Sequence, residues 1–319
     1  MRLRKTHLPR GVAEALWLNA SAVNANPFVD SEIEDFLTQA SRVAAAFPPE
    51  VHEDLYRLRI ATGEVRAILV RGLLSGSERD SSPHHRGRGS HASGPFQAEA
   101  ILAATVLAVG IPICFASQHD GYLVQDVTPV SGGEDSQASY GSQVFLNWHV
   151  EEAFLDKRPD LVALLCRRSG QQEAATLIAF PEDIDLPPWA REELLTSHFT
   201  FHPDAAHSGS VLAPVQRPVI EADHIGSSFR FDSAFMAVAG KRDGRAARAH
   251  GVLERRIQRN AVEIWPMRGD LLLFDNKRVV HARSAFTPSL DGTDRWLQRM
   301  TAWRCRVPEV QGSPAWVRV

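Results

Sequence analysis

Apolar residues recur every three or four positions in two stretches of the first third of the chain, which predicts two helices. The first covers residues 27–47, where Ser31 and Glu34 have the spacing of a capping box. Pro48-Pro49 follows and is expected to end this helix. The second covers residues 95–109 and is apolar on almost every side, so we expect it to be buried.

Beyond this second helix the apolar residues fall into short β-branched or aromatic runs, separated by Gly, Pro, Asp and Ser. This pattern is typical of an antiparallel double-sheet fold. The runs expected to be strands are Tyr122–Val127, Val144–His149, Leu161–Arg167, Ala175–Phe180, Ser197–Phe201, Ser228–Phe231, Ala261–Trp265, Leu271–Phe274 and Gln298–Arg304, with one earlier run at Val65–Leu74. Residues 246–259 are a charged exception and predict a surface helix. We therefore expect a mainly β protein with flanking helices and a double-stranded β-helix (jelly-roll) core.

No internal repeat is visible, and we expect a single domain over residues 1–319, in which a helical part, residues 1–115, packs on the jelly-roll core. Residues 75–94 are rich in Gly, Ser, Arg and His and almost lack apolar residues, which predicts a mobile loop. Its histidines, His84, His85 and His91, are poor metal candidates for the same reason. Residues 203–228 contain Pro and His and form a candidate lid over the site.

Composition narrows the possible partners and the compartment. With 35 basic and 38 acidic side chains the formal charge is −3, which gives no general attraction to nucleic acid or to an anionic membrane. The basic N-terminus is not followed by an apolar signal segment, and the apolar run Ile101–Ile113 is too short to span a bilayer. We expect a cytoplasmic protein in which Cys114, Cys166 and Cys305 are buried, unpaired thiols. The oligomeric state is not predicted.

Two segments far apart in the sequence together supply two imidazoles and a carboxylate. His149 and Glu151 are separated by one residue, so at a strand end they point to the same side of the chain. His281 follows the apolar run 271–274, which predicts a buried strand. A single histidine among 13 is more often structural. Two histidines and one carboxylate, however, leave three positions open on a non-haem Fe(II), as an oxygenase requires.

These segments resemble the motifs of the clavaminate synthase-like oxygenases. The matching blocks are Asn147-Trp148-His149-Val150-Glu151-Glu152-Ala153-Phe154, Gly269-Asp270, Asp275-Asn276, His281-Ala282-Arg283, Asp294-Arg295-Trp296-Leu297-Gln298-Arg299 and Gln118-His119-Asp120-Gly121. The resemblance extends from about residue 65 to residue 306. It implies Fe(II) as cofactor, 2-oxoglutarate and O2 as co-substrates, and His149, Glu151 and His281 as the catalytic iron ligands.

The resemblance also implies roles for individual side chains. By position, Arg295 would bind the far carboxylate of 2-oxoglutarate with help from Thr176. The alternatives are a surface ion pair for Arg295 and an ordinary strand threonine for Thr176. Arg299 would hold the α-carboxylate of an amino-acid substrate and also approach the co-substrate. The remaining residues expected at the substrate are Gln118, Glu151, Asp232, Ser139 and Tyr140, with a β-turn aspartate as the alternative for Asp232.

The expected reaction is hydroxylation of an unactivated carbon, Cβ or its neighbour, in a free L-α-amino acid, in natural-product (antibiotic) biosynthesis. Arg230 precedes Asp232 closely and would repel a cationic side chain unless it turns away, so we rank arginine behind neutral or singly charged substrates. Three alternatives stay open: a carrier-tethered or peptidyl amino acid as substrate, desaturation or cyclisation at the same site, and a non-catalytic jelly roll that binds a ligand.

Overall fold

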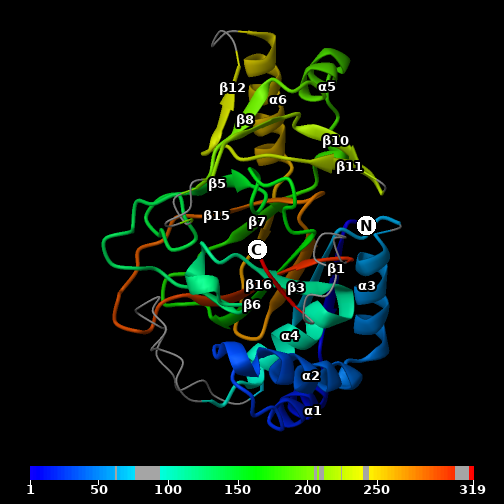
Figure 1. Cartoon of the computed structure of the whole chain (residues 1–319), viewed down its shortest axis with the longest axis vertical. Coiled ribbons are helices and arrows are strands. Elements are labelled where there is room, and N and C mark those ends of the chain that lie inside the picture. Colours follow the sequence, from blue (N-terminus) through cyan, green and yellow to red (C-terminus); the bar gives the residue numbers. More distant parts are fainter. Residues whose placement is uncertain are drawn as a thin grey trace.

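Two β-sheets face each other in the middle of the molecule, and helices lie at both ends (Figure 1). The computed structural model describes residues 1–61, 63–75, 94–204, 207, 212–223, 225–239, 244–305 and 316–319. The larger sheet contains, in order, β1 (Leu3–His7), β2 (Ala67–Arg71), β14 (Leu271–Asp275), β6 (Leu161–Arg168), β16 (Trp296–Trp303), β3 (Ile111–Cys114) and β17 (Val317–Arg318), and β4 (Gln125–Val127) also pairs with β16. Adjacent strands in this sheet are antiparallel, except that β1 pairs with β2, and β3 with β17, in parallel.

The smaller sheet carries the histidines singled out above. Its antiparallel order is β13 (Val262–Ile264), β7 (Thr176–Ala179), β15 (Val280–Arg283) and β5 (Leu146–His149). Ile178 and Ile264 of this sheet share a buried cluster with Leu69, Val162 and Phe274 of the larger sheet. Side chains on a strand alternate between the two faces, so this cluster shows that the two sheets pack against each other.

The other face of the larger sheet is covered by four helices. These are α1 (Arg10–Ala20), α2 (Ile33–Val43), α3 (Pro49–Ile60) and α4 (Gln97–Val109). Their apolar residues form one buried cluster with alternate sheet residues such as Val70, Leu165 and Leu273. Helix α4 is buried on nearly every side, as predicted, because it lies in the middle of this layer and contacts the other three helices.

The first predicted helix is shorter than expected, and its capping box is wrong. Residues Asp30–Glu32 form a 3-10 turn (η1), and α2 begins at Ile33 with Glu32 as its N-cap and no side-chain cap. The Glu32 carboxylate instead accepts a hydrogen bond from the Asn26 N–H at 2.8 Å, which draws it back toward the preceding loop. Another 3-10 turn, η2 (Ala44–Ala46), follows α2.

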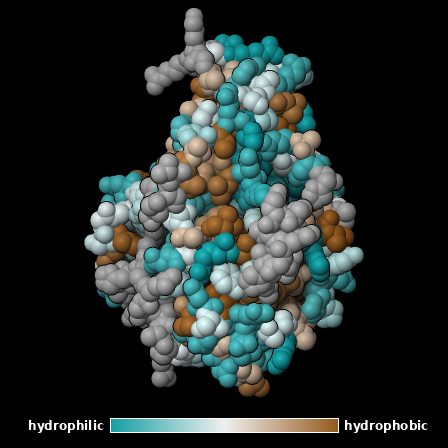
Figure 2. Space-filling view, viewed as in Figure 1, coloured by the Kyte–Doolittle hydropathy of each residue, from teal (hydrophilic) through white to brown (hydrophobic). Residues whose placement is uncertain are grey.

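The opposite end of the molecule contains two small sheets and two helices. Strands β12 (Met236–Val238), β8 (Phe199–Phe201) and β9 (Val215–Arg217) form one sheet, β10 (Ile220–Asp223) and β11 (Gly226–Phe229) form another, and α5 (Pro188–Leu194) and α6 (Arg245–Arg259) pack on each other. The predicted charged helix is confirmed by α6, which buries only Ala246, Ala249, Leu253 and Ile257. Figure 2, in the same view, shows hydrophilic residues over much of this end.

Several expectations need correction or lie outside the described residues. Part of the candidate lid, 203–228, is regular β-structure in β9, β10 and β11, while residues 205, 206, 208–211 and 224 lie outside the described residues. So do residues 76–93, which include most of the predicted mobile loop and its three histidines. Cys114 and Cys166 are buried, but Cys305 is exposed because it lies just beyond the end of β16. In the described part of the chain, no helix is both long and apolar enough to cross a membrane.

Candidate active site

A cavity of about 910 Å³, including its open mouth, lies between the two sheets. Leu164 of β6 and Leu297 of β16 line it from the larger sheet, and Thr176 of β7 and His281 of β15 line it from the smaller sheet. A mixture of apolar walls and a few converging polar groups is typical of a small-molecule site. Most of the polar residues predicted for the site line this cavity.

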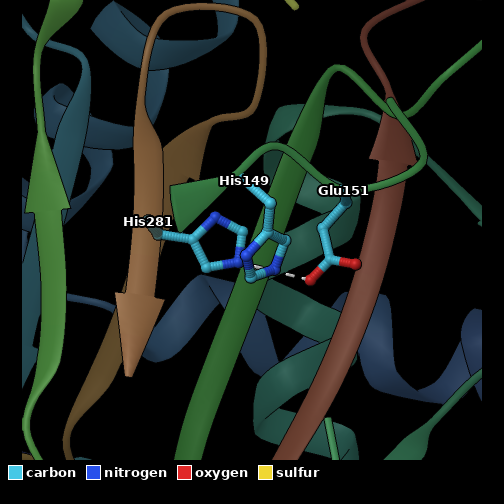
Figure 3. A group of neighbouring side chains, drawn as sticks. All are labelled: His149, Glu151 and His281. Atoms are coloured by element: carbon cyan, nitrogen blue, oxygen red, sulfur yellow. Dashed lines mark ion pairs between the residues drawn. The ribbon is translucent and has the colours of Figure 1, made fainter. Parts of the chain in front are cut away.

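Two histidines and a glutamate meet at one side of the cavity (Figure 3). His149 ends β5 and pairs in register with His281 of β15, so their rings lie 4.1 Å apart, centroid to centroid. Glu151 follows in the turn after β5, and its Oε1 lies 3.4 Å from Nε2 of His281. One potential ligand atom from each residue lies within 4.8 Å of the others. The structure therefore brings together the three residues predicted to bind iron.

The electrostatics of these residues suit a divalent metal. His149 Nδ1 lies 2.7 Å from the Asn147 carbonyl, which leaves Nε2 as the metal-facing nitrogen. Burial, and then the charge of His281, lower the pKa of His149 and favour the neutral form that can act as a ligand. Burial raises the pKa of Glu151, but Arg299 and His281 outweigh it and hold that pKa well below its ordinary value. Two imidazoles and one carboxylate are the donor set that Fe(II) accepts.

Asn276 fixes the turn that carries Glu151. Its Oδ1 accepts the Glu151 N–H at 2.8 Å, and its Nδ2 donates to the carbonyls of Glu151 and Pro159, both at 3.0 Å. Asn276 is fully buried, so these bonds are shielded from water. Residues that support a ligand in this way set the orientation of its side chain.

Arg295 places a cation in the same cavity. It is buried, and its Nη2 donates to Thr176 Oγ1 at 3.4 Å. No carboxylate of the described residues lies within 4.0 Å of its guanidinium nitrogens. Burial lowers the pKa of Arg295 to about 10. The surface ion pair considered as an alternative is therefore wrong, and the cation is available for an anion that enters the cavity.

Arg299 is held by groups that also belong to the predicted site. Its Nη1 donates to both carboxylate oxygens of Glu151 at 2.8 Å, its Nε to Gln125 at 2.8 Å, and its Nη2 to Gln118 at 3.3 Å. Nη2 also lies 3.2 Å from the His119 ring. A substrate carboxylate would have to displace some of these acceptors. Its role at the substrate stays a prediction.

Two further acidic side chains, Asp232 and Asp204, line the cavity. Asp232, which forms an isolated β-bridge with His149, accepts the N–H groups of Ala234 and Phe235 at 3.0 and 2.9 Å. The turn role considered as an alternative for Asp232 thus coexists with its place in the cavity. Burial, opposed by the charge of His149, raises the pKa of Asp232 to about 6. Asp204 also lines the cavity and was missed, because a lone aspartate in a loop carries no sequence signal.

The other predicted substrate residues divide into two groups. Gln118 and Ser139 line the cavity, whereas Tyr140 is not among its lining residues. Arg283 also lines the cavity, although the sequence motif His281-Ala282-Arg283 predicts no role for it at the site. It donates to the carbonyls of Gly141 and, at 3.0 Å, Val144, so it holds the loop that carries Ser139.

The position of Arg230 shows that it does not repel a cationic substrate side chain in the way expected from the sequence. Its guanidinium donates to the carbonyls of Ala153 and, at 2.9 Å, Leu155, and to Glu221 at 3.4 Å. It is buried and does not line the cavity. Arg230 therefore turns away from Asp232, and the expected repulsion of a cationic substrate has no structural basis.

Known proteins are similar to this chain in both sequence and architecture. The L-asparagine oxygenase of Streptomyces coelicolor is 32% identical over 291 residues, which cover 90% of this chain and 85% of that protein. A structure of asparagine oxygenase with Fe(II), 2S,3S-3-hydroxyasparagine and succinate superimposes with a TM-score of 0.85 at 28% identity and covers 98% of both chains. The non-heme iron oxygenase OrfP, in complex with Fe and alpha-ketoglutaric acid, has a TM-score of 0.85 at 26% identity and covers 99% of both chains, and another OrfP complex contains (3S)-hydroxy-L-Arg.

A family model also matches most of this chain. Residues 88–301, about two thirds of the chain, match the family described as taurine catabolism dioxygenase TauD, TfdA family. This range contains all three predicted iron ligands, Arg295 and Arg299. Together with the asparagine oxygenase relative, it identifies the chain as a member of the TauD/TfdA dioxygenase family.

Proposed function

We propose that this protein uses Fe(II), 2-oxoglutarate and O2 to hydroxylate an unactivated carbon, Cβ or its neighbour, of a free L-α-amino acid. One observation carries the proposal: His149, Glu151 and His281 share a cavity with Arg295, a buried cation that has no carboxylate partner among the described residues. The first three offer a metal site, and the last offers a place for a dicarboxylate. The complexes of asparagine oxygenase and OrfP support the same combination.

The fold proposed for this activity is a jelly roll formed by the two facing sheets, in one domain over residues 1–319. The shared core between the sheets and the layer of helices α1–α4 against the larger sheet support this arrangement. In a jelly roll, strands from both sheets line the mouth in which a ligand binds. Here β5, β7, β15 and β16 each contribute a side chain to the cavity.

The protein's own residues would bind and orient the reactants. His149, Glu151 and His281 would hold the iron, which supplies the activation of O2 needed to attack an unactivated C–H bond. Arg295 would pair with the far carboxylate of 2-oxoglutarate, because its planar fork can donate two parallel hydrogen bonds, and Thr176 would add a third donor. The apolar walls of the buried cavity would exclude water and strengthen these contacts.

The amino-acid substrate would lie between the arginine network and the acidic part of the cavity. Arg299 and Gln118 would contact its α-carboxylate and backbone, with Glu151 and Ser139 close to them. Asp232 and Asp204 would face its side chain. Because carboxylates accept hydrogen bonds, this end favours a side chain that ends in N–H donors, either an amide or a cation. Arginine thus ranks with asparagine instead of behind it.

The alternatives make different predictions about the product. A carrier-tethered amino acid is a thioester and has no carboxylate for Arg299, which favours the untethered substrate. Desaturation or cyclisation would remove two hydrogens in place of adding one oxygen. A non-catalytic ligand-binding protein would produce no succinate at all. The proposal includes a role in antibiotic biosynthesis, as the resemblance to the clavaminate synthase-like oxygenases implies.

The test is a turnover assay with the purified protein, Fe(II), 2-oxoglutarate and each proteinogenic amino acid and L-ornithine in air. We expect at least one amino acid to gain the mass of one oxygen atom, with an equal amount of succinate. His281→Ala should abolish both products, since it removes an iron ligand. Retained turnover in His281→Ala, or no amino-acid-dependent succinate in the wild type, would overturn the proposal.

A further inference from the structure

His207 connects two turns that border the cavity. Its Nδ1 lies 2.7 Å from Oγ of Ser117, and its Nε2 donates to Oε2 of Glu152 at 2.6 Å. The side chains of His207 and Glu152 are only 1% and 3% exposed. The imidazole also packs edge-on against Phe154, with ring centroids 5.0 Å apart, and against Phe115 at 6.1 Å. Both ring nitrogens are therefore bonded, and the ring plane is fixed by its neighbours.

The two turns carry residues with proposed roles in the reaction. Glu152 directly follows the ligand Glu151, and its φ of 58° lies in the left-handed region, which a glutamate rarely adopts. Ser117 directly precedes Gln118. Such a strained backbone conformation persists only where surrounding contacts hold it. The hydrogen bond from His207 is a contact of this kind.

Arg299 joins the same two turns at a second point. Its Nη1 donates to Glu151 and its Nη2 to Gln118. A substrate carboxylate that engages Arg299 would compete with these bonds and weaken the connection inside the cavity. Ser117 and His207 do not line the cavity, although Glu152 does, so a substrate carboxylate that engages Arg299 need not displace the hydrogen bonds of His207.

We propose that His207 is a positioning residue for the amino-acid substrate. The Ser117–His207–Glu152 bridge holds the Gln118 turn against the Glu151 turn while Arg299 changes partners from Glu151 and Gln118 to the substrate. This proposal rests on the proposed function, because that function gives Gln118 and Arg299 their roles. It predicts that loss of the bridge weakens amino-acid binding and misplaces the substrate, whereas binding of the co-substrate, held by Arg295, is little affected.

Three substitutions separate the hydrogen bonds from the packing. His207→Phe keeps an aromatic ring against Phe154 but removes both hydrogen bonds. His207→Gln can place an amide N–H near the position of Nε2 and so keep the bond to Glu152. Ser117→Ala removes only the other half of the bridge. His198→Phe is the matched control: His198 Nδ1 bonds Thr196 and Glu193 at 3.0 and 2.7 Å, and this exposed histidine lies between α5 and β8 and does not line the cavity.

The kinetic readout uses the one of L-asparagine, L-arginine, L-ornithine and L-lysine that the wild type hydroxylates fastest. For His207→Phe we expect the KM of this amino acid to rise about tenfold, the loss expected for a buried hydrogen bond to a charged group, while the KM of the co-substrate stays within about twofold. Succinate should exceed hydroxylated product, because a misplaced substrate lets the co-substrate react without it. His207→Gln and Ser117→Ala should lie between His207→Phe and the wild type, and His198→Phe should match the wild type.

Hydrogen–deuterium exchange gives a readout that does not need activity. In His207→Phe, peptides covering residues 115–122 and 150–155 should exchange faster together, and in His198→Phe neither should change. Unchanged exchange, or an unchanged KM for the amino acid, would overturn the proposal, as would an equal rise in both KM values. If the wild type turns over none of the four amino acids, the proposed substrate class fails, and the exchange experiment still decides whether the bridge couples the two turns.

Discussion

Arg295 and Arg283 line the same cavity, and the charge of Arg295 affects the ionisation of Arg283. Burial, and then the charge of Arg295, lower the pKa of Arg283 to about 9. Arg283 is compensated by the carbonyls of Gly141, Val144 and Ser284 and by the ring of Phe286, 5.3 Å from its guanidinium carbon. Among the described residues, the Arg295 side chain has only Thr176 as a hydrogen-bond partner. Two buried like charges, neither of them paired with a carboxylate of the described residues, favour the entry of an anion between the sheets.

Replacing Arg295 should therefore act on binding of 2-oxoglutarate. We expect Arg295→Gln to raise the KM of this co-substrate by about 100-fold, the loss of a bidentate, charge-assisted pair, and Arg295→Lys to raise it less, because a lysine keeps the charge without the fork. The KM of the amino acid should change by less than about threefold. Steady-state succinate release measures both constants. The exposed Arg59 on α3 gives the control Arg59→Gln, and an Arg295→Gln enzyme with the wild-type KM would contradict this role.

Asn276 should matter for both stability and metal affinity. Asn276→Ala removes two buried hydrogen bonds to Glu151 and one to Pro159 and leaves the Glu151 N–H unpaired, which should lower the free energy of unfolding by about 2–4 kcal/mol. Fe(II) affinity should fall by about 10- to 100-fold, the range for residues that orient a metal ligand.

Urea unfolding and anaerobic calorimetry of Fe(II) binding measure these two effects. Asn260 at the end of α6 is exposed and donates to the Arg256 carbonyl, so Asn260→Ala is a control that should change neither value by much. Wild-type metal affinity in a destabilised Asn276→Ala protein would show that the asparagine supports the fold alone.

The candidate metal ligands could be predicted because their spacing reflects the geometry of strand ends. His149 and Glu151 come from the end of a single strand, so their spacing alone places both side chains together. His281 follows a fully buried strand, β14, through a short turn. Arg230 could not be predicted in the same way. Its acceptors, the carbonyls of Ala153 and Leu155, lie more than 70 residues away, and sequence proximity to Asp232 says nothing about which way the side chain turns.

The elements that were missed lack a strong local pattern. Pro48-Pro49 correctly marks the end of one helix, but Pro49 is also the first residue of α3, where a proline without an N–H is well tolerated. Strand β1 buries only Leu3, and it exists because it pairs with β2, more than 60 residues later. Such long-range pairing leaves no periodic signal in five residues.

Chemical labelling of the cysteines tests whether Cys305 is exposed while Cys114 and Cys166 are buried. In the native protein at pH 8, Cys305 should react with iodoacetamide, whereas Cys114 and Cys166 should stay unmodified. Burial raises the pKa of the Cys114 thiol to about 11, so it is almost entirely protonated as well as inaccessible. Peptide mass spectrometry after timed labelling measures each site, and unfolding in urea should expose all three. Rapid modification of Cys114 in the native state would contradict the structure.

Gly170 links a loop outside the cavity to the position of Arg295. Its φ is 86°, and a Cβ at this position would lie 2.7 Å from the backbone nitrogen of Arg295. Gly170→Ala should therefore both strain the turn and push the backbone of Arg295 away from residue 170. Gly63 has a similar φ of 88°, but a Cβ there would meet nothing within 4 Å, so Gly63→Ala introduces only the unfavourable backbone conformation.

Comparison of these two glycine substitutions separates strain from displacement. Both should lower the free energy of unfolding by about 1 kcal/mol or more, since alanine disfavours a positive φ. Only Gly170→Ala should also raise the KM of the co-substrate, by about tenfold, because misplacing a charged hydrogen-bond donor by a fraction of an ångström weakens a bidentate pair. Thermal unfolding and succinate release measure the two effects. Equal KM values in Gly170→Ala and Gly63→Ala would mean that the Arg295 segment tolerates this displacement or that Arg295 does not bind the co-substrate, and Arg295→Gln decides between these two outcomes.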